Sequence, residues 1–494
     1  MNLSQKFDII RSVSNSSYWS KRIFSELCCL AEVSKIHGGE FDSHIEAAAD
    51  ELVAAIRENQ TIPAPIAQKV EADLSGFSPA VKAYTVYCVS HAHIDMNWMW
   101  GYHETASVTV DTFRTILTLM EEYPEFTFAQ SQASVYRIIE KHAPEMLEEI
   151  RRRVHEGRWE VSASTWVETD KNMPNGESLS RHILYTKRYL GKLLDISPDS
   201  IKIDFEPDTF GHNANVPEIL QNGGVDYYYH CRAHDEYFLY NWESPSGKRV
   251  LVFRDPRWYN GTIEYDTFVA DPLFCHQHGV NVNLFVYGVG DHGGGPTRRD
   301  IERIIDMSGW PLYPTIKFGT YGQYFAELEK FRDKLPTVKH ELNFVFTGCY
   351  TSQSRIKMAN RISEDRLYDS EALSTCAYLY AGAKPKAELF ASAWENTLFN
   401  HFHDILPGSG VIETREFALG RFQEAMATIN TCANIAMRDL AQAIDTSSIN
   451  FDDNKLTNSE GAGVGYNVDH SSGYYFPQTE RGRGKVRVLH LFNT

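Results

Sequence analysis

Metal-ligand side chains follow a short apolar run near residue 90. The run 84–89, Tyr-Thr-Val-Tyr-Cys-Val, is rich in β-branched and aromatic residues and predicts a buried strand. His91, His93 and Asp95 come next at alternate positions, and alternate residues of an extended chain point to the same face. Imidazole nitrogens and a carboxylate oxygen on one face suit a divalent cation such as zinc. Hydrogen-bonded core histidines and an aspartate that caps a helix would also fit this short pattern.

A second acidic group follows another predicted strand. Asp208 comes after the apolar run 201–205 and after Pro207, which favours an extended turn. Its carboxylate therefore projects from the end of the strand, where it can ligate a metal or act as a nucleophile. The alternative is that Asp208 caps the helix that follows.

Two further motifs place acidic groups beside glycine or histidine. Asp291 stands in the run Gly-Asp-His-Gly-Gly-Gly-Pro at 290–296, where the glycines let the backbone pass close to a ligand. A phosphate loop is the competing interpretation, but no Gly-Lys-Ser/Thr follows. His403 and Asp404 form a pair at a predicted helix end, where either residue could be a cap.

Alternating strands and helices are expected to position these groups. Amphipathic helical stretches such as 131–154 and 176–194 separate short apolar runs. This pattern predicts an α/β fold with a parallel sheet, either open or closed into a barrel, with ligands at the carboxyl ends of the strands. The runs that predict strands are 84–90, 126–129, 159–162, 201–205, 227–230, 250–253 and 284–287.

At 494 residues the chain is expected to form several domains. Residues 445–472 are rich in Asn, Asp, Ser and Gly and predict a linker, after which 485–492 begins a strand-like alternation. The predicted parts are an N-terminal helical segment at 1–82, a β/α catalytic domain at 83–345, a helical bundle at 346–445, and a linker with the first strand of an incomplete β domain at 446–494.

Composition limits the classes of binding partner and the cellular compartment that we expect for this chain. The formal net charge of −17 argues against nucleic acid, because the chain offers no basic stripe to displace phosphate counterions. The eight cysteines are scattered and form no C-x-x-C pair, which favours reduced thiols in a cytoplasmic protein. No apolar segment is long enough to cross a membrane, so no membrane partner is expected.

Taken together, the motifs resemble those of the α-mannosidases of glycoside hydrolase family 38, in the order found in that family. The matching runs are His91 to Trp98 (H-x-H-x-D followed by Trp), Asp208 to His212 (D-x-F-G-H), Gly290 to Pro296 (G-D-x-G-G-G-P), Gly348 to Ser352 (G-x-Y-T-S) with Asn360-Arg361, and His403 to Gly408 (H-D-x-x-x-G).

The resemblance implies a zinc-dependent retaining α-mannosidase that releases terminal α-D-mannosyl residues from oligosaccharides or glycans. Asp208 would be the nucleophile that forms a covalent mannosyl-Asp intermediate, and Asp291 the general acid/base, with His292 as the fallback. Cobalt or another divalent ion could replace zinc. The zinc ligands implied are His93, Asp95, Asp208 and His403.

The resemblance also implies residues that contact the sugar. Trp98 would stack on the sugar face, although a core tryptophan is the competing interpretation, and Asp404 would bind sugar hydroxyls. Arg232 and Tyr350 are further candidates for the pocket, and His91 would support the metal site without ligating it.

The implied fold is a β/α barrel-like catalytic domain, a helical bundle and then β-sandwich domains. The last part is nearly absent from this sequence, so we expect a chain that binds zinc but turns over substrate poorly.

Two other functions fit parts of the sequence. Metal-dependent amidohydrolases also begin with H-x-H on the first strand, but they need further histidines and usually a bridging lysine where this chain offers Asp208 and Asp291. An inactive mannose-binding fragment is the other alternative. The sequence leaves open the linkage preference and whether the chain forms a homo-oligomer.

Overall fold

The computed structural model describes residues 1–494 except 234–235, 344, 450–464, 467–476 and 479–489. Packing divides the chain into two compact units, 1–362 with 395–423 and 363–394 with 424–494. The four-part division expected from the sequence stays a prediction. Among the described helices, none combines the length and apolarity needed to cross a membrane.

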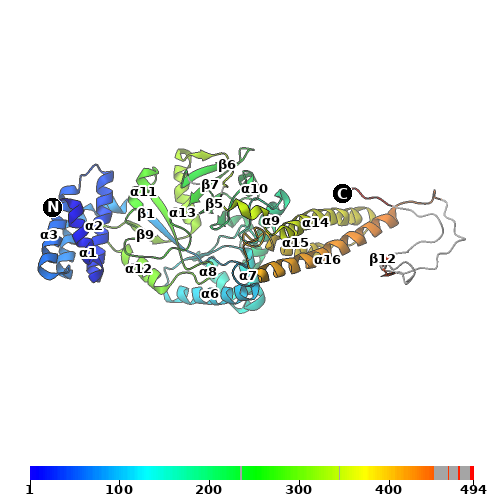
Figure 1. The fold of residues 1–494 in the computed structure, drawn as a ribbon, viewed down its shortest axis with the longest axis horizontal. Helices are drawn as coiled ribbons and strands as arrows, with labels where there is room; N and C mark the ends of the chain where they lie inside the picture. Colours follow the sequence, from blue (N-terminus) through cyan, green and yellow to red (C-terminus); the bar gives the residue numbers. More distant parts are fainter. Residues whose placement is uncertain (234–235, 344, 450–464, 467–476, 479–489) are drawn as a thin grey trace. The chain divides into compact units, whose positions relative to one another are not determined.

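The first unit begins with helices that share a core with the sheet. Ile10, Leu27 and Leu52 from these helices belong to one buried cluster with Val86 and Tyr287 from two strands. Figure 1 shows the first helices, in blue, beside the strand pair β1 and β9. The N-terminal helices are α1 (Leu3–Val13), α2 (Tyr18–Ile36), α3 (Asp42–Asn59), α4 (Ala64–Leu74) and α5 (Ser78–Lys82).

The strands of the first unit form an α/β fold with mostly parallel pairing. One sheet has the order β8-β1-β9, a second has the order β10-β6-β7-β5-β4, and β2 pairs with β3. All of these neighbours are parallel except β6 and β7. The strands are β1 (Thr85–Ser90), β2 (Phe128–Gln130), β3 (Trp159–Val161), β4 (Ile203–Glu206), β5 (Tyr227–His230), β6 (Leu239–Glu243), β7 (Arg249–Arg254), β8 (Val282–Tyr287), β9 (Thr315–Phe318) and β10 (Thr337–Val338).

The parallel arrangement confirms the fold class, whereas the closed barrel is not confirmed. Hydrogen bonds join these strands into separate ladders, and in the described part of the chain the ladders do not close into one ring. One isolated parallel bridge, between His91 and Ala129, links the end of β1 to the strand β2.

Helices follow most strands and cover the sheets. The helix expected at 131–154 is two helices, because Pro144 has no backbone N–H and its ring clashes with a preceding carbonyl. The stretch 176–194 is one helix, as predicted. The helices are α6 (Tyr102–Glu122), α7 (Ala133–His142), α8 (Leu147–His155), α9 (Gly176–Leu194), α10 (Val216–Asn222), α11 (Asp271–Gln277), α12 (Arg298–Ser308) and α13 (Tyr321–Leu328).

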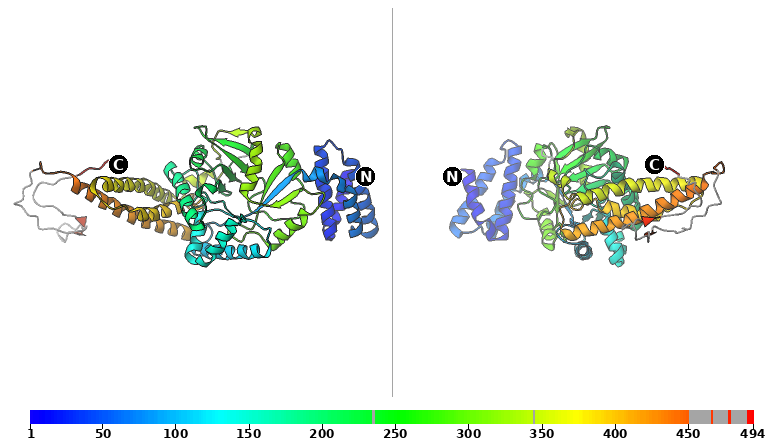
Figure 2. Two further views of the ribbon diagram at one scale, coloured as in Figure 1. Left: turned by 180° about the vertical axis from the view of Figure 1, so that it is seen from behind. Right: turned by 45° about the vertical axis from the view of Figure 1, so that its right-hand side comes forward.

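Long helices dominate the rest of the chain. They are α14 (Ser354–Ala381), α15 (Ala387–Phe399) and α16 (Ile412–Ala443), and the unit boundaries fall within or beside them. In the second unit α14 and α16 lie side by side, as both views of Figure 2 show. There Leu373 and Ala377 pack with Ala436, and the Ser370 hydroxyl donates to the carbonyl of Ile429 at 3.0 Å.

The C-terminal predictions fall mostly outside the described residues. This holds for most of the linker at 445–472 and for residues 485–489 of the strand expected at 485–492. Two short described strands, β11 (Gly465–Tyr466) and β12 (Pro477–Gln478), form an antiparallel pair.

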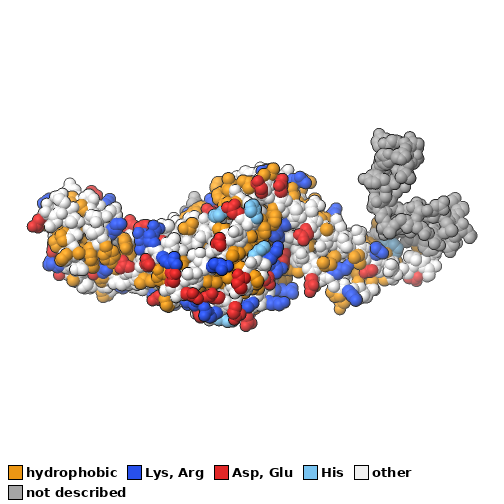
Figure 3. Space-filling model, turned by 90° about the horizontal axis from the view of Figure 1, so that it is seen from below, with side chains coloured by type: hydrophobic (Ala, Val, Ile, Leu, Met, Phe, Trp, Pro, Cys, Tyr) orange, Lys and Arg blue, Asp and Glu red, His pale blue; other side chains and the backbone are white. Residues whose placement is uncertain are grey.

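Charged side chains of both signs share the surface. Basic and acidic residues lie interspersed on the face of the molecule in Figure 3. The absence of a nucleic-acid partner, expected from the formal net charge of −17, stays a prediction.

Candidate active site

The segment after β1 is held by its neighbours on both sides. The backbone N–H of His91 donates to the Tyr287 carbonyl at 2.9 Å, and that of Asp95 donates to the Asp291 carbonyl at 2.9 Å. His93 and Asp95 are both 1% exposed. The strand end therefore places an imidazole and a carboxylate at fixed points inside the protein.

A second segment comes from far along the sequence. Thr169 and Phe402 form an antiparallel bridge, and the backbone N–H of Asp170 donates to the His401 carbonyl at 2.8 Å. The backbone N–H of His403 donates to the Glu168 carbonyl at 3.1 Å. We call this pairing of 168–170 with 401–403 the long-range pairing, and it brings His403 to the site.

Four side chains implied as zinc ligands meet at one point. The Nε2 atom of His403 lies 3.5 Å from Oδ1 of Asp95 and 3.6 Å from Oδ2 of Asp208. The Nδ1 atom of His93 lies 3.7 Å from the same oxygen of Asp95. Overlapping groups of these and adjacent side chains have ligand atoms close enough to hold a metal ion.

Two polar atoms at this point are buried without a hydrogen-bond partner among the described residues. Nε2 of His403 and Oδ1 of Asp95 are buried, and neither makes a hydrogen bond within the described part of the chain. Buried polar atoms are normally satisfied, so this pair fits a cation between them. The other nitrogen of each histidine is occupied: Nδ1 of His403 contacts the Glu168 carbonyl at 3.2 Å, and Nε2 of His93 contacts Oε2 of Glu168 at 2.5 Å. The residues present therefore fit a zinc ion.

Asp208 is kept ionised by its neighbours. Arg232 donates from Nε to Oδ1 of Asp208 at 2.6 Å. Burial alone would raise the pKa of Asp208, but His403 and Arg232 outweigh it and lower that pKa to about 2. A nucleophilic carboxylate needs this ionised form.

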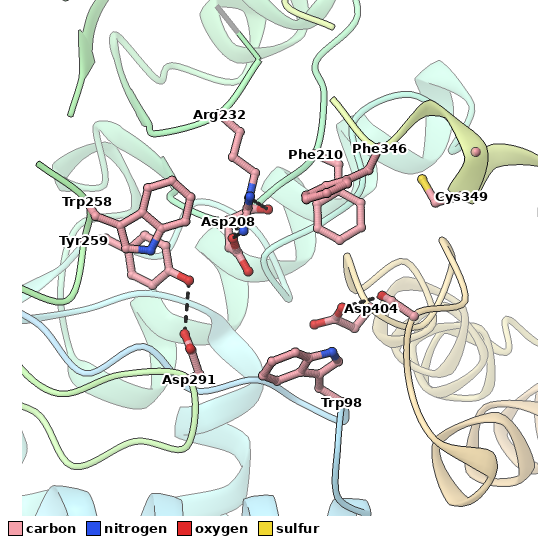
Figure 4. Close-up of a pocket in the computed structure, with 12 residues that line it drawn as sticks. Trp98, Asp208, Phe210, Arg232, Trp258, Tyr259, Asp291, Phe346, Cys349 and Asp404 are labelled. Atoms are coloured by element: carbon pink, nitrogen blue, oxygen red, sulfur yellow. Dashed lines mark hydrogen bonds and ion pairs between the residues drawn. The ribbon is translucent and has the colours of Figure 1, made fainter. Parts of the chain in front are cut away.

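A cavity of about 590 Å³ opens beside these groups. Asp208 and Asp291 both line it, with Trp98 and Asp404 along the same wall (Figure 4). Its volume is in the range of ligand pockets. The remaining lining residues are Phe210, Arg232, Trp258, Tyr259, Phe346, Gly348, Cys349 and Ser409.

Asp291 has the contacts of a positioned acid. Its Oδ1 accepts a hydrogen bond from the Tyr259 hydroxyl at 3.0 Å and lies 3.1 Å from Nδ1 of His93. Burial would raise the pKa of Asp291, but the His93 proton outweighs it and lowers the pKa below its usual value. A general acid needs the opposite shift, and a metal taking Nδ1 of His93 would remove the proton that causes the lowering. His292, the fallback, instead pairs with Glu104 at 2.7 Å.

Some of the other residues expected in the pocket line the cavity, and others do not. Arg232, Trp98 and Asp404 line the cavity, whereas Tyr350 is not among its lining residues and its hydroxyl accepts a hydrogen bond from Asn172. His91 is buried, with Nε2 placed 3.1 Å from the Ser131 hydroxyl. Its role as a support of the metal site stays a prediction.

The sequence did not identify three groups of this site. Glu168 contacts both histidines, Tyr259 contacts Asp291, and Trp258 lies under Arg232 with 4.6 Å from the guanidinium carbon to the ring centre. The one signal that could have found Glu168 is an acidic residue directly after the apolar pair Trp166-Val167.

Two family models match most of the chain. A model described as "Glycosyl hydrolases family 38 N-terminal domain" matches residues 83–341, and one described as "Alpha mannosidase middle domain" matches residues 345–440.

Two curated relatives extend the match along the chain. Alpha-mannosidase G of Dictyostelium discoideum is 32% identical over 364 residues, which cover 72% of this chain and 33% of that protein. Alpha-mannosidase 2C1 of Homo sapiens is 29% identical over 411 residues, which cover 78% of this chain and 38% of that protein. The chain thus spans about a third of the length of these relatives.

A solved structure supports the fold. An alpha-mannosidase from Enterococcus faecalis V583 matches with a TM-score of 0.67 and 24% identity, over 74% of this chain and 44% of that one.

Proposed function

Because this chain belongs to glycosyl hydrolase family 38, we propose that it is a zinc-dependent retaining α-mannosidase acting on terminal α-D-mannosyl residues of oligosaccharides or glycans. One observation carries the proposal: the Asp208 carboxylate lines the cavity and also lies 3.6 Å from a buried imidazole nitrogen with no hydrogen bond. A group so placed can serve a metal and a substrate together.

The zinc ion would be held by the two histidines and two aspartates that meet beside the cavity. When bound, it would orient sugar hydroxyls and stabilise negative charge on oxygen. These residues are His93, Asp95, Asp208 and His403; cobalt or another divalent ion would suit the same donors.

Asp208 and Asp291 divide the chemistry between them. A carboxylate oxygen of Asp208 attacks C1 of the mannosyl residue while Asp291 gives its proton to the departing glycosidic oxygen, leaving a covalent mannosyl-Asp bond. Asp291 then takes a proton from water as the water oxygen attacks C1 and Asp208 leaves. Two displacements at C1 return the original stereochemistry, and mannose is released.

Three side chains position the charges and the sugar. Arg232 fixes one oxygen of Asp208 by its hydrogen bond at 2.6 Å and limits rotation of the carboxylate. Trp98 offers an aromatic face in the cavity, and Asp404 offers hydroxyl-binding oxygens beside it (Figure 4).

The proposal also includes a cytoplasmic location and a domain architecture. The eight cysteines form no disulfide in the structure, which supports a reducing, cytoplasmic location. The parallel strands of the first unit support a barrel-like catalytic domain, and the long helices α14 and α16 support a helical bundle.

The test compares wild type with Asp208→Ala, using metal content and hydrolysis of 4-nitrophenyl α-mannoside. We expect wild type to bind one zinc ion and release nitrophenol, and the variant to lose activity and most of its metal. Asp111→Ala, on the exposed face of α6, is the control for removing an aspartate. Retention of both metal and activity by Asp208→Ala would refute the proposal, and hydrolysis of amides instead of the mannoside would favour an amidohydrolase.

A further inference from the structure

Glu168 contacts three of the four residues proposed to ligate zinc. We propose that this buried glutamate is a positioning residue, which sets the ring orientation of His93, anchors His403 and fixes the start of the turn that carries Asp208. The inference rests on the proposed function, because it concerns the same metal site. Glu168 is 0% exposed and does not line the cavity, so it cannot touch the substrate.

The side chain of Glu168 determines which nitrogen of His93 faces the metal. Its Oε2 lies 2.5 Å from Nε2 of His93, so this nitrogen carries the proton and donates it to the carboxylate. Nδ1 then has the lone pair for a metal, and it lies 3.1 Å from Oδ1 of Asp291 and 3.7 Å from Oδ1 of Asp95. A carboxylate behind a ligating histidine fixes its tautomer and raises its basicity.

The backbone of Glu168 does the same for the other histidine. Its carbonyl oxygen lies 3.2 Å from Nδ1 of His403 and 3.1 Å from the backbone nitrogen of that residue. The imidazole therefore keeps its proton on Nδ1 and leaves Nε2 free toward Asp95 and Asp208.

The second carboxylate oxygen reaches the nucleophile's own backbone. Oε1 of Glu168 accepts hydrogen bonds from the backbone N–H groups of Asp208 at 2.5 Å and Thr209 at 3.1 Å. These donors lie just beyond the end of β4, where the chain leaves the sheet. One carboxylate thus links His93, after β1, to Asp208, after β4.

The contacts also distinguish positioning from direct ligation. Both oxygens of Glu168 are occupied, one by an imidazole and the other by two backbone donors. By contrast, Asp95 and His403 present buried atoms that have no hydrogen bond. A metal ion would bind the unsatisfied atoms before it displaced three existing hydrogen bonds.

The decisive variant is Glu168→Gln, which keeps the shape of the side chain. Glutamine has one oxygen, and that oxygen can serve the two backbone N–H groups only if its NH2 group faces His93. The NH2 then donates to Nε2 and moves the ring proton to Nδ1, where it blocks ligation. We expect zinc affinity, measured by competition with a chromogenic chelator, to fall about 10- to 100-fold. Mannosidase activity should return when zinc is raised to saturation.

Glu160→Gln is the matched control. Glu160 also accepts two backbone N–H groups, from Tyr321 at 2.7 Å and Gly322 at 2.8 Å, and its hydrogen-bond donors among the described residues include no histidine. We expect this variant to keep wild-type zinc affinity, whatever it does to stability. If Glu168→Gln does not fold, Glu168→Asp takes its place, because it keeps the charge but is too short to span both sets of donors.

Three outcomes would overturn the inference. Zinc affinity of the Glu168 variant within twofold of wild type would show that the contacts do not position the ligands. Loss of binding as complete as in Asp95→Ala would make Glu168 a ligand rather than a positioning residue. Wild-type protein without zinc affinity would refute the proposed function, and the inference would fall with it.

Discussion

The two sides of the candidate site are built in different ways. The ligand side, which we define as the proposed ligands His93, Asp95 and His403 together with the positioning residue Glu168, is at most 1% exposed. Hydrogen bonds from Glu168 link its two histidines. The cavity rim, defined as Trp98, Trp258, Asp291 and Phe346, is more open, and Trp258 and Phe346 are 36% and 56% exposed.

Backbone conformation separates the two sides as well. Trp258, Asp291 and Phe346 have φ values of 78°, 68° and 52°, in the left-handed region that non-glycine residues seldom adopt. The four residues of the ligand side have no such φ value. The difference indicates that the proposed metal ligands are fixed by burial and hydrogen bonding, while groups that face the substrate, the proposed acid Asp291 among them, stand on strained backbone beside the cavity.

The largest effect should come from His403→Ala on the ligand side. Its removal takes away one of the four proposed ligands, so most of the metal should be lost. Activity should fall on the order of 10³-fold or more, because the metal supplies several kcal/mol of charge stabilisation. Metal analysis and initial rates test this, with His276→Ala on the surface of α11 as control. Wild-type metal content in His403→Ala would contradict the comparison.

On the rim, Asp291→Asn should reduce activity without removing the metal. Loss of the general acid should lower kcat by about 10²- to 10⁴-fold for methyl α-mannoside, and less for 4-nitrophenyl α-mannoside, whose leaving group needs little protonation. His292→Ala should have little effect, because this side chain pairs with Glu104. An equal loss on both substrates, or a larger loss in His292→Ala, would reassign the acid.

Trp258→Ala should weaken binding more than turnover. The lost stacking of about 0.5–1.5 kcal/mol predicts a KM raised roughly 3- to 10-fold with unchanged metal content. Trp19→Ala is a matched control, because Trp19 lies under Arg22 at 4.7 Å just as Trp258 lies under Arg232 at 4.6 Å. An unchanged KM would exclude Trp258 from substrate recognition.

The smallest effect should be that of Phe346→Gly on stability. Relief of the left-handed conformation, about 1–2 kcal/mol, opposes the lost ring contacts with Phe210 and Arg232. We expect the free energy of unfolding to change by less than about 1 kcal/mol in denaturant titrations. Phe402→Ala, which removes a buried ring of the long-range pairing, should instead cost about 3–5 kcal/mol. A comparable loss in both variants would contradict the distinction between rim and core.

The sequence predicted those parts of the fold whose pattern is local. Apolar runs marked the parallel strands, and 227–230 matched β5 residue for residue. The strand β6 was missed because the polar residues Asn241 and Glu243 interrupt its apolar run. Both residues are nevertheless buried in the folded chain. The run of β9 was missed because Lys317 and its half-exposed neighbours lack a continuous apolar signal.

Prediction of the site residues was also limited to patterns that are local in the sequence. Local spacing on a strand was enough to bring out His93 and Asp95 as candidate ligands. Glu168 was missed because its partners lie 75, 40 and 235 residues away, where no local motif can report them. Tyr350 illustrates the converse, since a motif cannot tell that Asn172 already occupies its hydroxyl.

The long-range pairing has a consequence for how the protein is synthesised. His93 and His403 are 310 residues apart, and His403 reaches the site only by pairing with 168–170. At about 5–20 residues per second, a ribosome needs roughly 15–60 s to synthesise the chain between them. During that interval the early ligands exist without their late partner, so the nascent chain cannot complete the metal site. On the proposed function, metal loading would therefore be a late step of biogenesis, after residues 401–403 have paired with 168–170.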